Sequence, residues 1–312
     1  MGSVLFLAPG DLAETVLATG ALAHVLREGA GTPVVTMLAT EEARSLFRAA
    51  PAMRVFMPWE HATTFALAAV LRGLRYDVVV DARGGLPGRI VSAARRIRLA
   101  PAAILRHRVD EWTESVGADR LLAPALWLDD RAREQASANA EAGPLIVLAP
   151  GGVAANKRWP PERFAAVARR LVGGPLASAQ VVVLGAAVRD ADTTRAIVSS
   201  LDADGVAARD PGQGLDLLAA AALLERATLC IGNDNALTHI AAAVGAPTLT
   251  LFGPTDERVR APFGPRARTL RGRSLEDIAA AHVLDAETAM GDISIDAVEA
   301  AALDLLHAGG LR

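Results

Sequence analysis

Short apolar runs alternate with amphipathic stretches along the chain, and the alternation occurs twice. In the first half, apolar runs at 4–7, 33–38, 55–57 and 76–80 are separated by helical patterns at 12–28, 41–49 and 64–74. In the second half, apolar runs at 145–148, 180–184, 205–208, 228–231 and 248–252 are separated by helical patterns at 161–172, 189–200, 214–225 and 236–244. Fully apolar short strands that alternate with helices are typical of parallel sheets covered on both faces. The pattern therefore predicts an α/β protein with two doubly wound domains.

The joint between the two domains is predicted near 127–143, where a charged helical stretch at 129–141 precedes Gly143 and Pro144. The predicted domains are then 1–143 and 144–293, followed by a closing segment at 294–312 whose helix begins at Ser294. No apolar run reaches the roughly 18 residues of a membrane span. The first apolar run has strand length and is followed by Asp11, unlike a signal peptide. We expect a soluble cytoplasmic protein.

The composition of the chain argues against several classes of function. The formal net charge is -3, which argues against general binding of nucleic acids. The single cysteine, Cys230, lies in an apolar run, which predicts a buried strand thiol and excludes a disulfide framework or a cysteine-based zinc site. We expect neither a metal site nor a cofactor.

Lys157 is the one lysine among the 32 cationic residues. The bias toward arginine and alanine indicates a GC-rich genome, so the arginines alone do not signal function. Arg83 and Arg89 in the first domain could attract an acidic acceptor, and the alternative is a solvated arginine face. A lysine in a chain whose composition disfavours lysine is stronger evidence of a functional residue than any of the arginines.

Ligands of open parallel sheets bind beyond the carboxyl ends of the strands, where loops lead into helix N-termini. The first such loop contains Pro9, Gly10 and Asp11, directly before the first predicted helix. A carboxylate at that place could act as a general base toward a substrate hydroxyl. The alternative is structural, because Asp11 and Glu14 have the spacing of a helix capping box.

The second loop, 149–160, follows the strand predicted at 145–148. Its paired glycines, Gly151 and Gly152, would let backbone N–H groups approach an anion closely. Lys157 adds a compact charge suited to phosphate, although the spacing of a Walker loop is absent. A plain surface loop with one cation is the alternative, and the rarity of lysine favours an anion site.

The third segment, 231–239, ends a strand in polar residues and begins a short apolar helix. Asp234, Asn235 and the first N–H groups of the helix converge there, which favours phosphate. His239 lies one turn further on, on the helical face of Asn235. The alternatives are a structural histidine and a simple N-cap.

Taken together and in order, these motifs resemble glycosyltransferase family 9, the ADP-heptose:lipopolysaccharide heptosyltransferases and their relatives. In the N-terminal half the resemblance is carried by residues 10–11, 19–22 and 76–81, with Gly84 and Arg89. In the C-terminal half, residues 150–160 match P-G-x…K-x-W-P, and residues 234–256 resemble D-[ST]-G-x-x-H…G-x-P…[FY]-G-P-T-D. Residues 294–298 are similar to the closing helix of the family, so the resemblance spans essentially the whole chain.

The resemblance implies a GT-B fold, in which two Rossmann-like domains face a cleft and the C-terminal helix crosses back to the first domain. It also implies inverting, metal-independent transfer of heptose or a similar sugar from a nucleotide diphosphate-sugar, such as ADP-heptose. The implied acceptor is the lipopolysaccharide core or another cell-surface glycan or glycolipid. A lipid-linked acceptor would bring the protein to the inner face of the cytoplasmic membrane as a peripheral protein.

The resemblance also assigns roles to residues of this chain. Asp11 would take the proton from the acceptor hydroxyl. Arg83 and Arg89 remain candidates to bind the acceptor because of their charge. The donor would be held by Gly151, Gly152, Lys157, Asp234, Asn235, Ala236 and His239.

Two residues depart from the family pattern, since Asn235 replaces a serine or threonine and Ala236 replaces a glycine. The acid that often follows the glycine-alanine pair is also missing, and Asp190 is a candidate to hold the ribose instead. These departures leave open a catalytically silent relative that binds nucleotide-sugars. A second alternative is another two-Rossmann enzyme, such as a UDP-sugar epimerase. A dehydrogenase is disfavoured because no G-x-G-x-x-G follows a strand.

Overall fold

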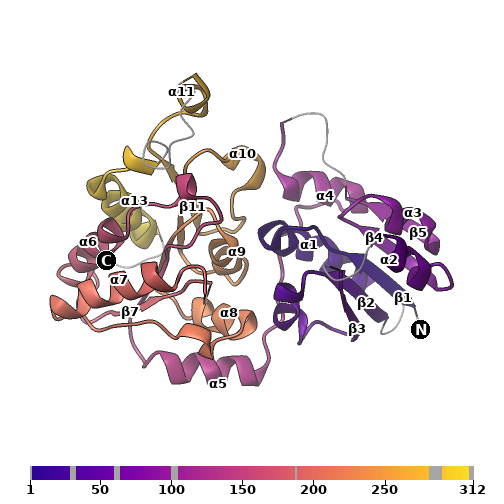
Figure 1. Ribbon diagram of the computed structural model, residues 1–312, viewed down its shortest axis with the longest axis horizontal. Coiled ribbons are helices and arrows are strands. Elements are labelled where there is room, and N and C mark those ends of the chain that lie inside the picture. Colours follow the sequence, from indigo (N-terminus) through magenta and orange to yellow (C-terminus); the bar gives the residue numbers. More distant parts are fainter. Residues whose placement is uncertain are drawn as a thin grey trace. The chain divides into compact units, whose positions relative to one another are not determined.

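The computed structural model describes residues 2–28, 33–59, 64–99, 105–186, 188–280 and 290–308. The chain divides into two compact units, Met1–Asp129 and Asp130–Arg312. Each unit is built on a parallel sheet with helices (Figure 1). The predicted architecture of two doubly wound domains is confirmed.

The first unit has a five-stranded sheet in the order β3-β2-β1-β4-β5. Its strands are β1 (Ser3–Leu7), β2 (Val34–Ala39), β3 (Met53–Pro58), β4 (Arg75–Asp81) and β5 (Ser92–Arg98), and its helices are α1 (Leu12–Glu28), α2 (Thr64–Leu71), α3 (Leu86–Ile90) and α4 (Arg108–Val116). The strand order reverses between β1 and β4, so the loops after these two strands flank the topological switch point, where ligands of such sheets bind.

The second unit has a six-stranded sheet in the order β11-β10-β9-β6-β7-β8. Its strands are β6 (Leu145–Ala149), β7 (Gln180–Val183), β8 (Ala208–Arg209), β9 (Leu229–Asn233), β10 (Thr248–Phe252) and β11 (Ala267–Arg271). Its helices are α5 (Asp130–Asn139), α6 (Pro161–Val172), α7 (Ala191–Ala203), α8 (Leu217–Glu225), α9 (Ala236–Ala243), α10 (Glu257–Arg260), α11 (Leu275–Ala280) and α13 (Ile295–Ala308). Here the switch point lies between β6 and β9.

The central strands of both sheets are apolar and buried, as the sequence pattern predicts. All residues of β6, β9 and β10 are buried. Burial raises the pKa of the Cys230 thiol to about 12, and this confirms the predicted buried strand thiol. None of the helices within the described ranges is long and apolar enough to cross a membrane.

The sequence pattern did not predict the helices α3, α4, α10 and α11. Two edge strands and one helical stretch also differ from the prediction. β5 and β11 were not predicted because both carry arginines, such as Arg95 and Arg268, on their exposed positions. An edge strand needs fewer apolar residues than a central strand, since part of it faces solvent. The predicted helix at 41–49 is instead two short 3₁₀ turns, η1 (Glu41–Ala43) and η2 (Ser45–Phe47).

The domain boundary lies earlier than the predicted 143, because α5 belongs to the second unit. The buried face of α5 packs against α8. The Arg226 guanidinium, just after α8, donates to the carbonyl oxygens of Ala136, Ala140 and Glu141 at the end of α5. These contacts tie the charged helix to the second sheet.

The closing helix packs on the core of the second unit. α13 contacts α6 and the strands β9, β10 and β11, all within the second unit. Its buried residues Val298, Ala302 and Leu305 join the apolar core of that unit. The apolar face of the helix is therefore used inside its own unit.

Gly20 of α1 marks a close contact within the first unit. A Cβ at this position would collide with the carbonyl oxygen of Leu122 and would lie 2.6 Å from that of Ala123. Next to it, the Thr19 hydroxyl accepts a hydrogen bond from the N–H of Ala125 at 2.9 Å. The glycine therefore lets the segment before α5 lie directly on α1.

We expect Gly20→Ala to lower the free energy of unfolding by about 1–3 kcal/mol, because the added methyl must displace backbone. Urea unfolding of the full chain measures the change. Gly73→Ala is the matched control, since a Cβ at Gly73 meets nothing within 4 Å. Equal stability of the two variants would contradict this packing.

Candidate functional site

Two asparagines join the loops after β6 and β9 at the switch point of the second sheet. The amide nitrogen of the fully buried Asn233 donates to the carbonyl oxygen of Pro150 at 2.6 Å. Its amide oxygen accepts from the N–H of Trp159 at 3.1 Å. Trp159 is itself buried and donates through Nε1 to the carbonyl oxygen of Ile293 at 2.9 Å. Both ends of the loop that contains Lys157 are therefore fixed to β9.

The side chain of Asn235 is a second bridge between these loops. Its amide nitrogen donates to the carbonyl oxygens of Ala149 and Gly151, both at 2.9 Å. Its amide oxygen accepts from the N–H groups of Leu237 at 2.9 Å and Thr238 at 3.3 Å, at the start of α9. Both hydrogens and both lone pairs of this amide are thus used within the protein. The side chain of Asn235, which is one of the predicted donor-binding residues, joins the two loops that build the site.

The structure gives no hydrogen bond to a described residue for the N–H groups of the buried Gly151 and Gly152. The same holds for the N–H of Ala236, the first residue of α9. Buried backbone N–H groups are nearly always paired in proteins. Donors on two adjacent loops, one of them at a helix N-terminus, form a suitable cradle for an anion.

Asp234 lies at the centre of a charged cluster beside this cradle. The Lys157 ammonium donates to its Oδ2 atom at 3.0 Å, and the Nε2 atom of the buried His239 lies 3.9 Å from its Oδ1 atom. The hydroxyl of Thr255, on the loop after β10, also interacts with Asp234. Burial alone would raise the pKa of Asp234, but His239, Lys157 and Thr255 together outweigh burial and hold that pKa well below its usual range. The carboxylate is therefore ionised at neutral pH.

Lys157 keeps part of its binding capacity after this ion pair. Its ammonium has three N–H donors, of which one reaches Asp234. The side chain is 26% exposed, so the remaining donors are accessible to a ligand. Because Asp234 balances the charge of Lys157, the affinity for an anion depends on both residues.

Asp190 has a structural role beside the loop after β6. Its buried carboxylate accepts from the N–H of Ala186 at 2.9 Å, and a Cβ at Gly151 would collide with its Oδ2 atom. Gly151 is therefore a glycine because a carboxylate packs against it. This contact ties the loop after β7 to the loop after β6.

Asp11 ends the loop after β1 at the switch point of the first sheet. Its side chain is exposed, and its Oδ1 atom accepts from the N–H of Glu14 at 3.0 Å, as the capping alternative predicts. The Glu14 carboxylate lies 3.6 Å from the Arg108 guanidinium. Capping occupies Oδ1, and the exposed carboxylate still faces solvent at the carboxyl edge of the sheet.

Trp59, which the sequence analysis did not single out, connects the loop of Asp11 to Arg83. The indole ring packs on Gly10, where a Cβ would lie 3.4 Å from Cη2. The Arg83 guanidinium carbon lies 3.6 Å from the centre of the same ring. Arg89 is exposed on α3, so of the two predicted acceptor arginines the structure joins Arg83 to this loop. An aromatic residue two positions after a predicted strand was the available signal.

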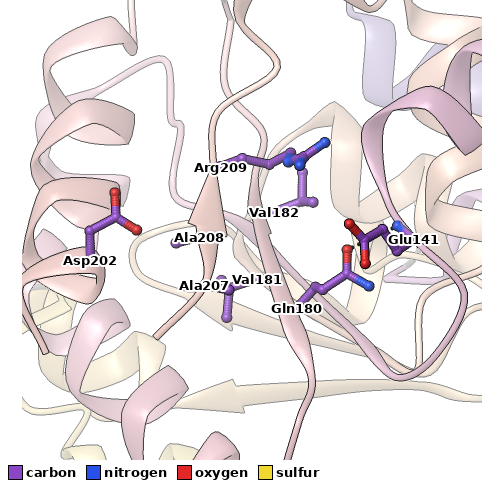
Figure 2. Close-up of a pocket in the computed structure, with 8 residues that line it drawn as sticks. All are labelled: Glu141, Gln180, Val181, Val182, Asp202, Ala207, Ala208 and Arg209. Atoms are coloured by element: carbon purple, nitrogen blue, oxygen red, sulfur yellow. Dashed lines mark hydrogen bonds between the residues drawn. The ribbon is translucent and has the colours of Figure 1, made fainter. Parts of the chain in front are cut away.

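A cavity of about 200 Å³ lies elsewhere in the second unit, as Figure 2 shows. It is lined by the first residues of β7 and by β8, with Glu141, Asp202 and Arg209 around it. Gln180 begins β7 and Glu141 precedes β6, so the cavity lies at the amino ends of these strands. None of the predicted site residues lines it. Within the described ranges, no group of three or more His, Cys, Asp or Glu side chains gathers as a metal site.

Two Rossmann-like units with these strand orders define the GT-B fold, and solved structures agree. The structure of E. coli ADP-heptose LPS heptosyltransferase II aligns with a TM-score of 0.78 at 19% identity, covering 98% of this chain and 99% of that one. A structure of an E. coli heptosyltransferase with ADP aligns with a TM-score of 0.72 at 17% identity, covering 97% and 99%.

The sequence profile of glycosyltransferase family 9 (heptosyltransferase) matches residues 112–289, more than half of the chain. The chain belongs to this family. It is 31% identical to lipopolysaccharide heptosyltransferase 2 of Salmonella typhimurium over 130 residues, and 30% identical to the E. coli protein of that name over a match of the same length. Each alignment spans 41% of this chain and 36% of the length of the relative.

The bridge made by Asn235 predicts an order of stability among its variants. Asn235→Ser can still cap α9 but removes both amide donations, so we expect the free energy of unfolding to fall by about 1–3 kcal/mol. Asn235→Asp keeps the cap but places a carboxylate oxygen against two carbonyl oxygens, and it should be less stable than Asn235→Ser at neutral pH. Urea unfolding measures both values. An Asn235→Asp variant as stable as the wild type would show that the bridge is not made.

Proposed function

We propose that this chain is an inverting, metal-independent glycosyltransferase that moves heptose or a similar sugar from a nucleotide diphosphate-sugar to an acceptor hydroxyl. The observation that carries the proposal is the cradle at the β6/β9 switch point. There, the N–H groups of Gly151, Gly152 and Ala236, which have no partner among the described residues, lie on the loops that carry Lys157 and Asp234. A diphosphate leaving group needs such donors, because negative charge develops on it as its bond to the sugar breaks.

The second unit would hold the donor. Its backbone donors and the ammonium of Lys157 bind the diphosphate, while Asp234 accepts hydrogen bonds from hydroxyl groups of the sugar. His239 is buried with Nδ1 unpartnered among the described residues, and it supports the carboxylate of Asp234 from the side of α9. Ala236 is not among the residues with positive φ, so its backbone does not need the glycine of the family pattern.

The first unit would supply the base. The Asp11 carboxylate takes the proton of the acceptor hydroxyl as the acceptor oxygen attacks the anomeric carbon. The new carbon–oxygen bond forms on the face opposite to the bond that breaks, and the electron pair of that bond leaves with the diphosphate. The configuration of the anomeric carbon is inverted.

The names of the relatives support ADP-heptose as the donor and the lipopolysaccharide core as the acceptor. Two relatives are named lipopolysaccharide heptosyltransferase 2, and one of the similar solved structures contains ADP. An acceptor of this kind is attached to a lipid. We therefore propose a cytoplasmic protein that works in peripheral contact with the inner face of the membrane.

The donor site predicts how variants of Lys157 bind nucleotide. At a concentration of roughly 100 times its Kd, ADP should stabilise the wild type by about 2.7 kcal/mol. A thermal-shift assay detects this change, and UDP and GDP are tested in the same way. Lys157→Ala should weaken binding at least about tenfold, and Lys157→Arg should also weaken it because a planar fork replaces a compact ammonium. Arg195→Gln, at an exposed position of α7, is the matched loss of one positive charge.

A double variant tests the ion pair itself. Lys157→Ala leaves the Asp234 charge unbalanced beside the diphosphate, so Lys157→Ala/Asp234→Asn should bind ADP more tightly than Lys157→Ala alone. If ADP, UDP and GDP all fail to stabilise the wild type, the donor site is wrong. If the double variant binds ADP no better than the single variant, the two charges do not act together.

The assignment of the base predicts a different pattern for Asp11. Asp11→Asn keeps an oxygen that can cap α1 but cannot accept the proton, so transfer should fall by about 10²–10⁴-fold. Its ADP thermal shift should equal that of the wild type. Turnover measured with radiolabelled ADP-heptose and extracted lipopolysaccharide acceptor checks the rate, and unchanged turnover would remove Asp11 as the base.

A further inference from the structure

Two arginines and one buried carboxylate form a charged cluster beside the cradle of the second unit. The carboxylate belongs to Asp190, whose side chain is 2% exposed. Nε of Arg189 lies 3.4 Å from its Oδ1 atom, and Nη2 of Arg158 lies 3.9 Å from the same atom. A Cβ at Gly151 would collide with its Oδ2 atom. The cluster of Arg158, Arg189 and Asp190 therefore lies directly against the loop that carries the cradle.

The side chain of Asp190 is turned away from its own helix. An aspartate that precedes a helix is a preferred N-cap, yet the side chain of Asp190 makes no cap hydrogen bond to α7. Its Oδ2 atom instead accepts from the N–H of Ala186 at 2.9 Å. Asp190 was the candidate to hold the ribose, but a carboxylate that is buried among these protein groups is not open to a ribose hydroxyl. Its contacts position the two arginines.

Both guanidinium groups keep N–H donors that a ligand can reach. Nε of Arg158 donates to the carbonyl oxygen of Gly152 at 2.8 Å, which fixes this side chain on the cradle loop. A guanidinium has five N–H donors, so this bond uses only one of them. The side chains of Arg158 and Arg189 are 33% and 46% exposed. The arginines are thus held from one side and accessible from the other.

The charge balance separates this cluster from its neighbours. Three ion pairs of described residues at the carboxyl ends of the second sheet each join one cation to one anion, namely Lys157–Asp234, Arg258–Asp256 and Arg271–Glu257. Arg158 and Arg189 share a single carboxylate, so two positive groups and one negative group leave a formal charge of +1. The pair of Lys157 and Asp234 is neutral as a whole. A diphosphate is anionic, and the cluster supplies the net positive charge that this pair lacks.

The order of the strands indicates which end of the diphosphate the cluster meets. The sheet places β6 between β9 and β7, so Asp234 lies after one neighbour of β6 and Arg189 after the other. In a nucleotide-binding βαβ unit the phosphates lie at the first loop and the nucleoside extends toward the end of the second strand. Here that unit is β6, α6 and β7. The cluster therefore lies on the side of the nucleoside, and Asp234 on the side of the sugar.

We propose that Arg158 and Arg189 bind the phosphate nearest to the nucleoside, and that Asp190 is the residue that positions them. The assignment rests on the proposed function, because the phosphate belongs to the donor. Lys157 and the backbone donors of the cradle bind the rest of the diphosphate. The end of β7 thus presents guanidinium groups to a phosphate in place of a carboxylate to the ribose hydroxyls.

Calorimetric titration of the full chain with pyrophosphate, ADP and 2′-deoxy-ADP tests this assignment. Arg189→Gln is the main variant, because the hydrogen bonds of the Arg189 side chain to described residues go to Asp190 and not to the cradle loop. It should raise the Kd of all three ligands by the same factor, about three- to tenfold for a partly exposed contact to phosphate. Arg158→Gln/Arg189→Gln should raise each Kd at least about tenfold.

The matched control is Arg195→Gln, which removes one positive charge from an exposed position of α7 and should leave all three Kd values unchanged. Urea unfolding at wild-type stability shows that Arg189→Gln is folded. The proposal is overturned if Arg189→Gln binds the ligands as Arg195→Gln does. It is also overturned if Arg189→Gln weakens ADP but leaves pyrophosphate or 2′-deoxy-ADP unchanged, since the guanidinium would then contact the nucleoside.

The two proposals can fail separately. If ADP binding depends on Lys157 but not on Arg158 or Arg189, the cluster is not part of the donor site and the proposed function stands. If ADP, UDP and GDP all fail to bind but pyrophosphate binds through the two arginines, the proposed function is wrong and phosphate binding by the arginines stands.

Discussion

The hydrogen bonds that Asn233 and Asn235 make across the β6/β9 switch point are the constraint on which the second unit depends. They fix the carbonyl groups of Ala149, Pro150 and Gly151 and the N–H of Trp159. Once these groups are fixed, the N–H groups of Gly151 and Gly152 have no partner within the described chain. Lys157 is held between the anchored glycines and the buried Trp159, within reach of Asp234. The polar side chains at the end of β9 thus create the cradle, and the ligand would meet mainly the backbone and Lys157.

The two units carry different charged groups at the switch points of their parallel sheets. At the β1/β4 switch point an exposed carboxylate, Asp11, lies on the loop that Trp59 joins to the guanidinium of Arg83. At the β6/β9 switch point an ammonium and backbone donors lie beside an ionised carboxylate. Charged groups of both signs follow the strands at each switch point, so the formal net charge of -3 of the whole chain does not describe either site. The arrangement suits a reaction in which a proton leaves one substrate and a diphosphate leaves the other.

Much of the fold could be predicted from apolar runs, because central parallel strands are buried on both faces. The edge strands β5 and β11 could not, since arginines such as Arg95 and Arg268 break the apolar pattern where a strand faces solvent. The loop positions of Asp11, Lys157 and Asp234 followed from the rule that ligands bind at the carboxyl ends of strands. The bridging role of Asn235 and the stacking of Trp59 on Arg83 depend on contacts between segments far apart in the sequence, which no local pattern contains.

Backbone hydrogen exchange of the full chain with and without ADP tests the central claim most directly. If the cradle binds the diphosphate, ADP should slow the exchange of amides in peptides covering 149–157 and 234–240, including those of Gly151, Gly152 and Ala236. Peptides at the amino ends of β7 and β8, around the cavity shown in Figure 2, should exchange as before. Binding of ADP that protects other segments and leaves the loops after β6 and β9 unchanged would contradict the account.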